Sequence, residues 1–410
     1  MENPKIRFKG FTKDWEQRKL SDVLDIVTKR NGEKYGKEEV LSVSDEYGCI
    51  NQIKFQGRSF AGEDISNYKI VDTGDIIYTR SPLKSKPYGI IKVVGDEIGI
   101  VSPLYIVNKV KEGNNSQFIY RVFDSPEKTN KYLSPLVRKG AKNTMNISND
   151  EWLSGKIDVA PSYEEQYQIG LYFDHLDHLI TLHQRKCEQT KKLKKYMLQK
   201  MFPQNGAKVP EIRFDGFTYD WEQRKLGDDL VSIHTGTNLL GSITNTGMPL
   251  IKMGNIQRGY FDTSKVEFLA ENEQPDKADI VNYGDFFFNT RNTLELVGKG
   301  ATWMKNSGEY AFNSNIARFE LRNLDTIFFN YLYNTDYMTK QIHARAMGTT
   351  SVAAIYPRTL DSVEYLAPCM KEQQKIGAYF KQLDHLITLH QRKCDELKKM
   401  KKYMLQNMFI

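Results

Sequence analysis

The sequence predicts an α+β chain built from two similar halves, in which two mixed α/β globular regions accompany two long helices that pair antiparallel as a coiled coil. Residues 6–20 return almost unchanged as residues 212–226, and residues 176–187 return without change as residues 383–394. The segments between these blocks match only weakly. A repeated frame around two different inserts indicates an internal pseudo-two-fold repeat.

Each half ends in a proline-free segment with heptad spacing, which predicts helices at residues 164–202 and 371–410. Two identical apolar stripes can cover each other, and a two-fold relation makes such helices antiparallel, each about 55 Å long. The stripes, which we call the seam, comprise Ile169, Phe173, Leu176, Ile180, Ile376, Phe380, Leu383 and Ile387. The alternative is that each stripe packs on its own globular region.

The globular regions, residues 1–163 and 203–370, combine strand and helix patterns. We expect strands at residues 74–80, 89–94, 284–291 and 316–321, the first and third opened by a Gly-Asp turn. Aromatic-rich segments at 118–123 and 326–338 predict short helices that pack on the sheets. Because the C-terminal residues resemble the start of the linker between the halves, we expect the two termini to lie close together.

Composition limits the class of protein. With 410 residues the chain can form several cores, and its formal charge of +7 permits a polyanionic partner without requiring one. The four cysteines form no close pair, so neither a disulfide framework nor a zinc site is indicated. No apolar run is long enough for a signal core or a membrane span, which favours a cytoplasmic protein without a membrane partner.

Catalytic signatures are missing from the sequence. It contains no phosphate-binding Gly-x-x-x-x-Gly-Lys-Ser/Thr loop, no Gly-x-Gly-x-x-Gly, no His-Glu-x-x-His and no Gly-x-Ser-x-Gly. His178 and His183 are five residues apart, which places them on different helix faces rather than around one metal. We therefore expect no catalytic residue, no metal site and no bound cofactor in this chain.

Polar loops follow equivalent strands in both halves and are the candidate site for double-stranded DNA. Arg, Lys, Asn, Gln, Ser and Thr side chains hold phosphates and read base edges, although they also occur in ordinary surface loops. The candidate DNA-binding residues are Arg80, Lys84, Lys86, Arg138, Lys142, Asn143, Asn255, Gln257, Arg258, Arg291, Asn292, Arg345, Thr349, Thr350 and Ser351. The same loop positions carry different side chains in the two halves, which indicates two different readers.

Three doubled motifs suggest a family. Trp-Glu-x-x-Lys-Leu occurs at 15–20 and 221–226, and Gly-Asp opens the strands at Gly74 and Gly284. Pro-x-x-x-Glu-Gln-x-x-Ile leads into the helices at 161–169 and 368–376. In this order, and over essentially its whole length, the chain resembles the specificity subunit of a type I restriction-modification system.

The resemblance implies that residues 1–163 and 203–370 are target recognition domains, each binding half of a bipartite, asymmetric DNA target. The helices would be conserved spacers that set the distance between the half-sites. It implies a non-catalytic subunit that recruits two modification (methyltransferase) subunits and then restriction (translocase and nuclease) subunits. S-adenosylmethionine, ATP and Mg²⁺ would bind those partners, and no cofactor would bind this chain.

Two alternatives stay open. One is a single-chain endonuclease or methyltransferase with an unrecognised active site, and the other is a coiled-coil interaction scaffold without a DNA role.

Overall fold

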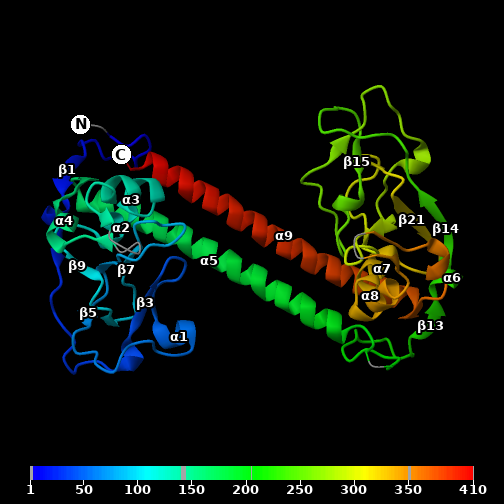
Figure 1. Cartoon of the computed structure of the whole chain (residues 1–410), viewed down its shortest axis with the longest axis horizontal. Coiled ribbons are helices and arrows are strands. Elements are labelled where there is room, and N and C mark those ends of the chain that lie inside the picture. Colours follow the sequence, from blue (N-terminus) through cyan, green and yellow to red (C-terminus); the bar gives the residue numbers. More distant parts are fainter. Residues whose placement is uncertain (1–2, 140–144, 205, 350–351, 410) are drawn as a thin grey trace. The chain divides into compact units, whose positions relative to one another are not determined.

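The computed structural model describes residues 3–139, 145–204, 206–349 and 352–409. The chain divides into two compact units: unit 1 is Met1–Gln184 with Arg392–Ile410, and unit 2 is Arg185–Gln391. The long helices α5 (Tyr163–Lys200) and α9 (Met370–Asn407) therefore each contribute to both units (Figure 1). They begin one residue earlier, and end two and three residues earlier, than predicted, because the buried Met-Phe pairs that follow leave the helices and enter the cores.

A four-stranded antiparallel sheet lies at the centre of each unit. In unit 1 its order is β2 (Leu24–Ile26), β9 (Ile106–Val110), β6 (Ile76–Tyr78) and β7 (Ile91–Val93). In unit 2 its order is β14 (Leu230–Thr235), β21 (Ile316–Leu321), β17 (Phe286–Asn289) and β19 (Gly300–Thr302). The four predicted strands are all present, and the two sheets share one topology.

The remaining elements surround these sheets. In unit 1 they are β1 (Glu16–Lys19), β3 (Leu41–Ser44), β4 (Gly48–Asn51), α1 (Gln52–Gln56), β5 (Lys69–Val71), β8 (Gly99–Val101), α2 (Ser116–Val122), α3 (Pro126–Leu133), β10 (Arg138–Lys139), β11 (Met145–Asn146), α4 (Asn149–Ser154) and β12 (Lys156–Val159). In unit 2 they are β13 (Glu222–Lys225), α6 (Leu226–Asp229), β15 (Pro249–Ile251), β16 (Glu267–Phe268), β18 (Arg291–Asn292), β20 (Ala311–Phe312), α7 (Thr326–Tyr333), α8 (Asp336–His343), β22 (Met347–Gly348), β23 (Ala353–Ala354) and β24 (Glu364–Ala367). This combination confirms the α+β fold class.

The helix predicted at residues 326–338 is instead two helices, α7 and α8. The Thr335 hydroxyl accepts a hydrogen bond from the Met338 N–H and so caps the second helix. A capped start needs a residue outside helical geometry, which breaks the segment between the two. By contrast, the helix predicted at residues 118–123 is present as α2, and Asn115 caps it by accepting from the Phe118 N–H.

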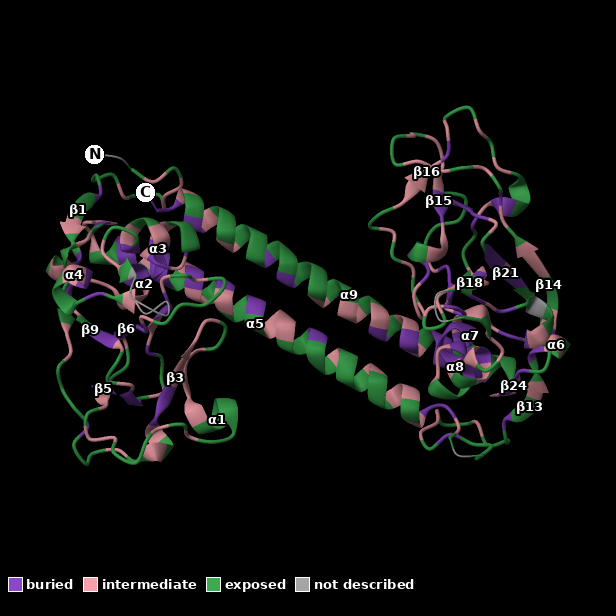
Figure 2. Cartoon of the chain, viewed as in Figure 1, coloured by how far each residue is buried: buried purple, intermediate pink, exposed green. Residues whose placement is uncertain are grey.

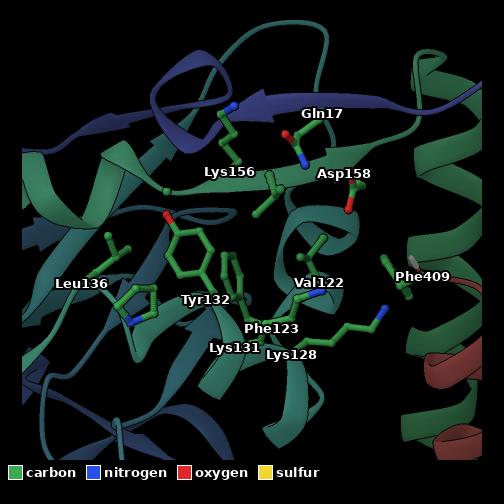
Figure 3. Close-up of a pocket in the computed structure, with 13 residues that line it drawn as sticks. Gln17, Val122, Phe123, Lys128, Lys131, Tyr132, Leu136, Lys156, Asp158 and Phe409 are labelled. Atoms are coloured by element: carbon green, nitrogen blue, oxygen red, sulfur yellow. The ribbon is translucent and has the colours of Figure 1, made fainter. Parts of the chain in front are cut away.

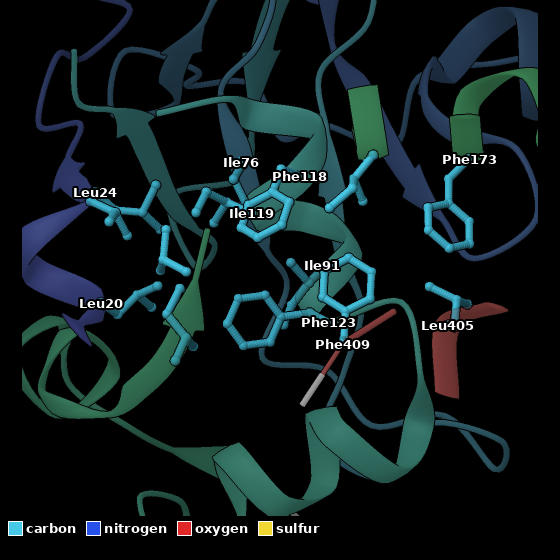
Figure 4. Packing of buried hydrophobic residues seen from close by; sticks show 14 of the residues in the cluster. Leu20, Leu24, Ile76, Ile91, Phe118, Ile119, Phe123, Phe173, Leu405 and Phe409 are labelled. Carbon is cyan, nitrogen blue, oxygen red and sulfur yellow. The ribbon is translucent and has the colours of Figure 1, made fainter. Parts of the chain in front are cut away.

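Aromatic side chains dominate the core of each unit. In unit 1 Trp15, Phe118 and Phe173 contact the ring of Phe409, which follows α9. Figure 4 shows Phe118, Phe173 and Phe409 in this core. In unit 2 the equivalent cluster forms around Phe202, which follows α5 and contacts the rings of Trp221, Phe328 and Phe380. The core of each unit is therefore completed by the end of the helix that belongs to the other repeat.

The seam residues pack both on the adjacent globular region and on the other long helix. Along the part of α5 in unit 1, Ile169 and Leu176 join the core of the adjacent globular region and also meet the end of α9. All seam residues are buried except Ile387, which is half-buried. Figure 2 shows buried stretches alternating with exposed ones along α5 and α9.

The helix segments run antiparallel within each unit. In unit 1, Phe173 contacts Phe409 while Asp177, four residues later, pairs with Lys401. In unit 2, Cys187 lies against Gln391, and Lys194 pairs with Asp384. In both units, later residues of α5 contact earlier residues of α9, which confirms the predicted antiparallel direction.

The segments next to the two chain termini lie together. The Ile6 N–H donates to the Asn407 carbonyl at 2.9 Å, and the repeat equivalent joins Ile212 to Lys200 at the same distance. The first bond connects the start of the chain to the end of α9, which confirms the predicted proximity (Figure 1).

Candidate nucleic-acid interface

Buried ion pairs fix the opening segment of each half on its long helix. Arg7 Nε lies 2.5 Å from Glu165 Oε1, and Arg213 Nε lies 2.7 Å from Glu372 Oε1, with both carboxylates buried. The hydrogen bond to Glu165 raises the pKa of Arg7 despite partial burial. The Glu of the repeated Glu-Gln motif thus makes the same ion pair in both halves.

The Gln of the same motif positions the helix on the sheet. Gln166 accepts from the Asn115 N–H and donates to the Ala160 carbonyl, each at 2.8 Å. Gln373 makes the equivalent bonds, to the Asp325 N–H and the Pro368 carbonyl, at 2.9 Å each. The contacts of the Glu-Gln motif thus recur in both units, and the frame presents the loops from equivalent positions.

In unit 1 the loop after β6 is joined to the β10–β11 hairpin. Arg80, which has a positive φ of 54°, donates from Nε to the Leu104 carbonyl at 2.8 Å and from a terminal nitrogen to the Ile147 carbonyl at 3.2 Å. Ile147 directly follows β11, so the guanidinium clamps the loop against the hairpin. Arg80 therefore has a structural role that sequence reasoning did not foresee.

In unit 2 the equivalent loop joins its hairpin by strand pairing. Arg291 of β18 pairs with Ala354 of β23, and β23 pairs with β22. The candidate loops predicted in each half are thus neighbours within each unit. We call this combination the loop–hairpin surface: residues 80–88 with β10–β11 in unit 1, and residues 290–297 with β22–β23 in unit 2.

The loop–hairpin surface of unit 1 carries exposed cations. The Lys84 side chain is exposed, and that of Arg138 is 85% exposed, with Glu151 3.2 Å away. Lys86 is less accessible because its ammonium pairs with Asp45 at 2.5 Å. The predicted residues Lys142 and Asn143 lie outside the described residues.

The same surface in unit 2 is more apolar. Arg291 is exposed, while Asn292 accepts a hydrogen bond from the Thr293 N–H at 2.8 Å. Exposed apolar and aromatic side chains lie on and next to the hairpin: Met347, Val352 (67% exposed) and Tyr356. Sequence reasoning missed these three, because burial habits place such side chains in the core.

The hairpin connection of unit 2 is closed by its own hydrogen bonds. The Thr349 N–H donates to the Val352 carbonyl at 2.9 Å, and the Thr349 hydroxyl accepts from the Val352 N–H. The predicted residues Thr350 and Ser351 lie outside the described residues.

Two of the candidate residues in unit 2 make hydrogen bonds within the fold. Asn255 is only 7% exposed, and its amide donates to the Asp262 and Lys265 carbonyls at 2.9 and 2.8 Å. The Arg345 guanidinium donates to the carbonyls of Thr359 and Ser362 at 2.8 and 2.9 Å. Side chains used in this way have few donors left for a ligand.

Gln257 and Arg258 are half-buried and have protein partners. Gln257 accepts from the Lys299 ammonium at 2.7 Å, and Arg258 lies 3.0 Å from His343 Nε2. Burial and the Arg258 charge lower the pKa of His343. A neutral imidazole can accept this hydrogen bond, so Arg258 is held beside the helix that leads to the hairpin.

The described residues contain no group of three or more His, Cys, Asp or Glu side chains arranged to hold a metal ion. Among them, no helix has the length and apolarity needed to cross a membrane.

A duplicated frame that presents a different loop–hairpin surface on each copy defines a class of two-part recognition subunit. The family described as type I restriction modification DNA specificity domain matches residues 12–192 and 219–399. The chain belongs to this family, and its members are DNA-recognition subunits of restriction-modification systems rather than catalytic ones.

Relatives extend over nearly the full chain. A proposed MjaX specificity subunit of Methanocaldococcus jannaschii is 23% identical over 96% of this chain and 92% of its own length. The MjaVIII specificity subunit of the same organism is 25% identical over 60% of this chain and 59% of its own length. The crystal structure of the S subunit of a type I system from M. genitalium superposes with a TM-score of 0.62 at 12% identity, covering 100% of this chain and 99% of that one.

Proposed function

We propose that each unit reads one half of a bipartite, asymmetric double-stranded DNA target through its loop–hairpin surface. The main support for the proposal is that the two units share the same frame but have different loop–hairpin surfaces. The Arg-Glu and Gln contacts recur in both units, whereas the loop–hairpin surfaces carry Lys84 and Arg138 in one and Arg291 with Met347 in the other. Different surfaces on equal frames suit a target whose halves differ.

The exposed cations have separable roles in this proposal. Arg291 is assigned to a base edge, where a bidentate contact to guanine contributes about 1–3 kcal/mol of discrimination. Lys84 and Arg138 are assigned to phosphates, which add affinity without sequence information. Arg80, Asn255 and Arg345 are not assigned to DNA, because their polar groups are engaged in the protein.

The long helices are assigned the spacing between the half-sites and the docking of two modification subunits. Restriction subunits join the complex through these partners, and S-adenosylmethionine, ATP and Mg²⁺ bind the partners rather than this chain. A cytoplasmic location follows for a subunit that meets chromosomal or invading DNA. Domain limits at 1–163 and 203–370 are part of the same proposal.

The test uses Arg291→Ala in a cell that carries the complete system. Methylome sequencing should show relaxed recognition at one position in one half of the target, with the other half unchanged. Lys225→Ala, an exposed cation on the β13–β24 ladder, serves as the control and should leave the target unchanged. Loss of sequence preference in both halves would contradict the assignment.

A second experiment separates recognition from catalysis. The purified chain is incubated with plasmid DNA, Mg²⁺, ATP and S-adenosylmethionine in the absence of partners. We expect neither cleavage nor methyl transfer; either activity would replace this proposal with a single-chain enzyme.

A further inference from the structure

The small sheet of unit 2 that joins the loop to its hairpin carries three side chains in one row. Arg291 of β18 is directly opposite Ala354 of β23, and Ala354 is directly opposite Met347 of β22. Directly opposite residues of antiparallel strands point to the same face of a sheet. A guanidinium, a methyl group and a methionine side chain therefore lie side by side, and we call them the Arg-Ala-Met row.

The Arg-Ala-Met row faces away from the core. Ala353 and Ile355, on either side of Ala354, are buried, whereas Ala354 itself is half-buried. Met347 is 59% exposed, and Arg291 is exposed as well. The Arg291 guanidinium makes no hydrogen bond or ion pair with another described residue. Because successive residues of a strand point to opposite faces, the buried neighbours hold the row outward.

The hairpin of unit 1 is attached to its core at equivalent points. The chain enters this hairpin after α3, where Leu136 lines a pocket of about 280 Å³ (Figure 3). Val137, before β10, packs on the core, and Ile147, after β11, is buried in it. Ala346 and Ile355 take these places in unit 2. The two hairpins can therefore be compared position by position.

At one pair of equivalent positions the two hairpins differ in polarity. Arg138 of β10 is directly opposite Asn146 of β11, as Met347 is opposite Ala354. The Arg138 side chain is 85% exposed, and Asn146 is exposed. Because the hairpin of unit 1 forms with polar side chains here, the fold does not require an apolar one at Met347. The place of Met347 beside a free guanidinium, on the surface proposed to read DNA, indicates a contact with the ligand instead.

The major groove of DNA offers an apolar group that such a side chain can contact. This group is the 5-methyl of thymine, whereas adenine, guanine and cytosine present polar groups there. Neighbouring strands lie about 4.8 Å apart, so the Arg-Ala-Met row is about 10 Å long. Laid along the groove, a row of this length covers about three base pairs at about 3.4 Å each. Its two ends can therefore reach different bases of one half-site.

We propose that Met347, together with the Ala354 methyl group, contacts the 5-methyl group of a thymine in the half-site read by unit 2. That thymine lies within about three base pairs of the guanine assigned to Arg291. The inference rests on the proposed function, which places Arg291 on a base edge, and it adds the identity of a second base. Unit 1, with Arg138 and Asn146 at these positions, makes no equivalent methyl contact.

Deoxyuridine lacks only the methyl group of thymine, so it tests the contact without any change to the protein. Once methylome sequencing has given the target, duplexes are made in which one thymine at a time is replaced by deoxyuridine. Fluorescence anisotropy measures their affinity for the complex of this chain with its modification subunits. We expect one replacement in the half-site of unit 2 to weaken binding about fourfold, the effect of losing one methyl-sized apolar contact. Equal affinity for every duplex would overturn the inference.

A variant of the methionine assigns the contact to its side chain. Met347→Gln keeps the length of the side chain and removes its apolar end, so the same replacement should no longer change the affinity. Met400→Gln alters an exposed methionine of α9 outside the loop–hairpin surface, and this matched control should keep the discrimination. Circular dichroism checks that both variants are folded. Undiminished discrimination by Met347→Gln would overturn the inference in favour of another reader of the methyl group.

The outcomes separate this inference from the function on which it rests. If Arg291→Ala leaves the methylated sequence unchanged, the proposed function fails. If Arg291→Ala relaxes one position but no thymine lies within about three base pairs of it, only the methyl contact is wrong. If Met347→Gln weakens binding equally for thymine and deoxyuridine duplexes, the methyl contact is also wrong, in favour of a side chain inserted between base steps.

Discussion

The two units hold their helices with equivalent lysines but with different partners from the inserts. In unit 1, Lys401 pairs with Asp177 of α5 and with Asp124, both at 2.7 Å. In unit 2, Lys194 pairs with Asp384 of α9 at 2.5 Å. The Lys-Asp pair between the helices thus recurs, while the residues around it change, including Asp174 of α5, whose equivalent on α9 is Lys381.

The globular region of each unit also supplies a side chain that contacts the aspartate of this pair. That side chain is charged in unit 1 and neutral in unit 2. Arg121 on α2 pairs with Asp124, Asp174 and Asp177 at 2.7, 2.7 and 2.6 Å. At the equivalent place on α7, the Tyr331 hydroxyl donates to Asp384 at 2.9 Å. The comparison teaches that an insert can vary as long as one side chain satisfies the aspartate on the long helix.

The largest effect is expected at seam positions that both units share. Leu176→Asp and Leu383→Asp should each destabilise the adjoining unit by about 3–5 kcal/mol, because a buried charge is left without a partner. Hydrogen exchange measured by mass spectrometry assigns the loss to a unit. Leu179→Asp and Leu389→Asp, which alter exposed positions of the same helices, should cost less than about 0.5 kcal/mol. Equal costs at all four positions would rule out a buried seam.

The next effect distinguishes the two units. Arg121→Tyr installs the side chain of unit 2 and should destabilise unit 1 by about 3 kcal/mol, since Asp124, Asp174 and Asp177 lose a buried cation. Tyr331→Phe removes one hydrogen bond and should cost about 1 kcal/mol in unit 2. Urea unfolding with unit-resolved hydrogen exchange measures both, and the comparison breaks down if Tyr331→Phe is the more damaging change.

The stability that the ion pairs of Asp124 contribute to unit 1 should depend on pH. Burial would raise the pKa of Asp124, but the charges of Lys401 and Arg121 outweigh it and hold that pKa well below its usual range. A depressed pKa contributes stability above the unfolded value of about 3.9, and this is lost as pH falls further towards the folded pKa.

Asp124→Asn, which matches Asn334 of unit 2, should therefore cost about 2 kcal/mol at pH 7 and progressively less below about pH 4. Thermal unfolding followed from pH 7 to pH 3 checks the trend. A cost that stays constant over this range would show that the carboxylate charge is not involved.

The smallest expected difference concerns the repeated tryptophans. Trp15 donates from Nε1 to Glu165 at 3.2 Å, whereas the buried Nε1 of Trp221 has no hydrogen-bond partner among the described residues. Trp15→Phe should therefore cost about 1 kcal/mol more than Trp221→Phe in urea unfolding. Identical costs would mean that the two opening segments are equivalent in energy as well as in sequence.

Sequence patterns predicted those features that depend on local order. The heptad spacing of residues such as Phe173 and Phe380 predicted both helices, the repeat predicted their antiparallel direction, and the Gly-Asp turns placed the strands that became β6 and β17. These signals are periodic or adjacent in the chain, so they need no knowledge of distant partners.

The roles of single loop residues could not be predicted in the same way. Arg80 is bonded to carbonyls at Leu104 and Ile147, and Arg345 to those at Thr359 and Ser362, so their partners depend on how loops meet in space. Exposed apolar side chains such as Val352 were missed because they depart from the usual burial habit.

The interleaving of the two repeats has a consequence for synthesis. Unit 2 is complete once residue 391 has been made, whereas unit 1 still lacks Phe409 and its neighbours, although most of unit 1 is translated first. Unit 1 therefore cannot complete its core until residues translated after the whole of unit 2 have left the ribosome. Until Phe409 and its neighbours emerge, Trp15 and Phe173 lack part of their packing. The nascent chain then exposes apolar side chains that chaperones can bind.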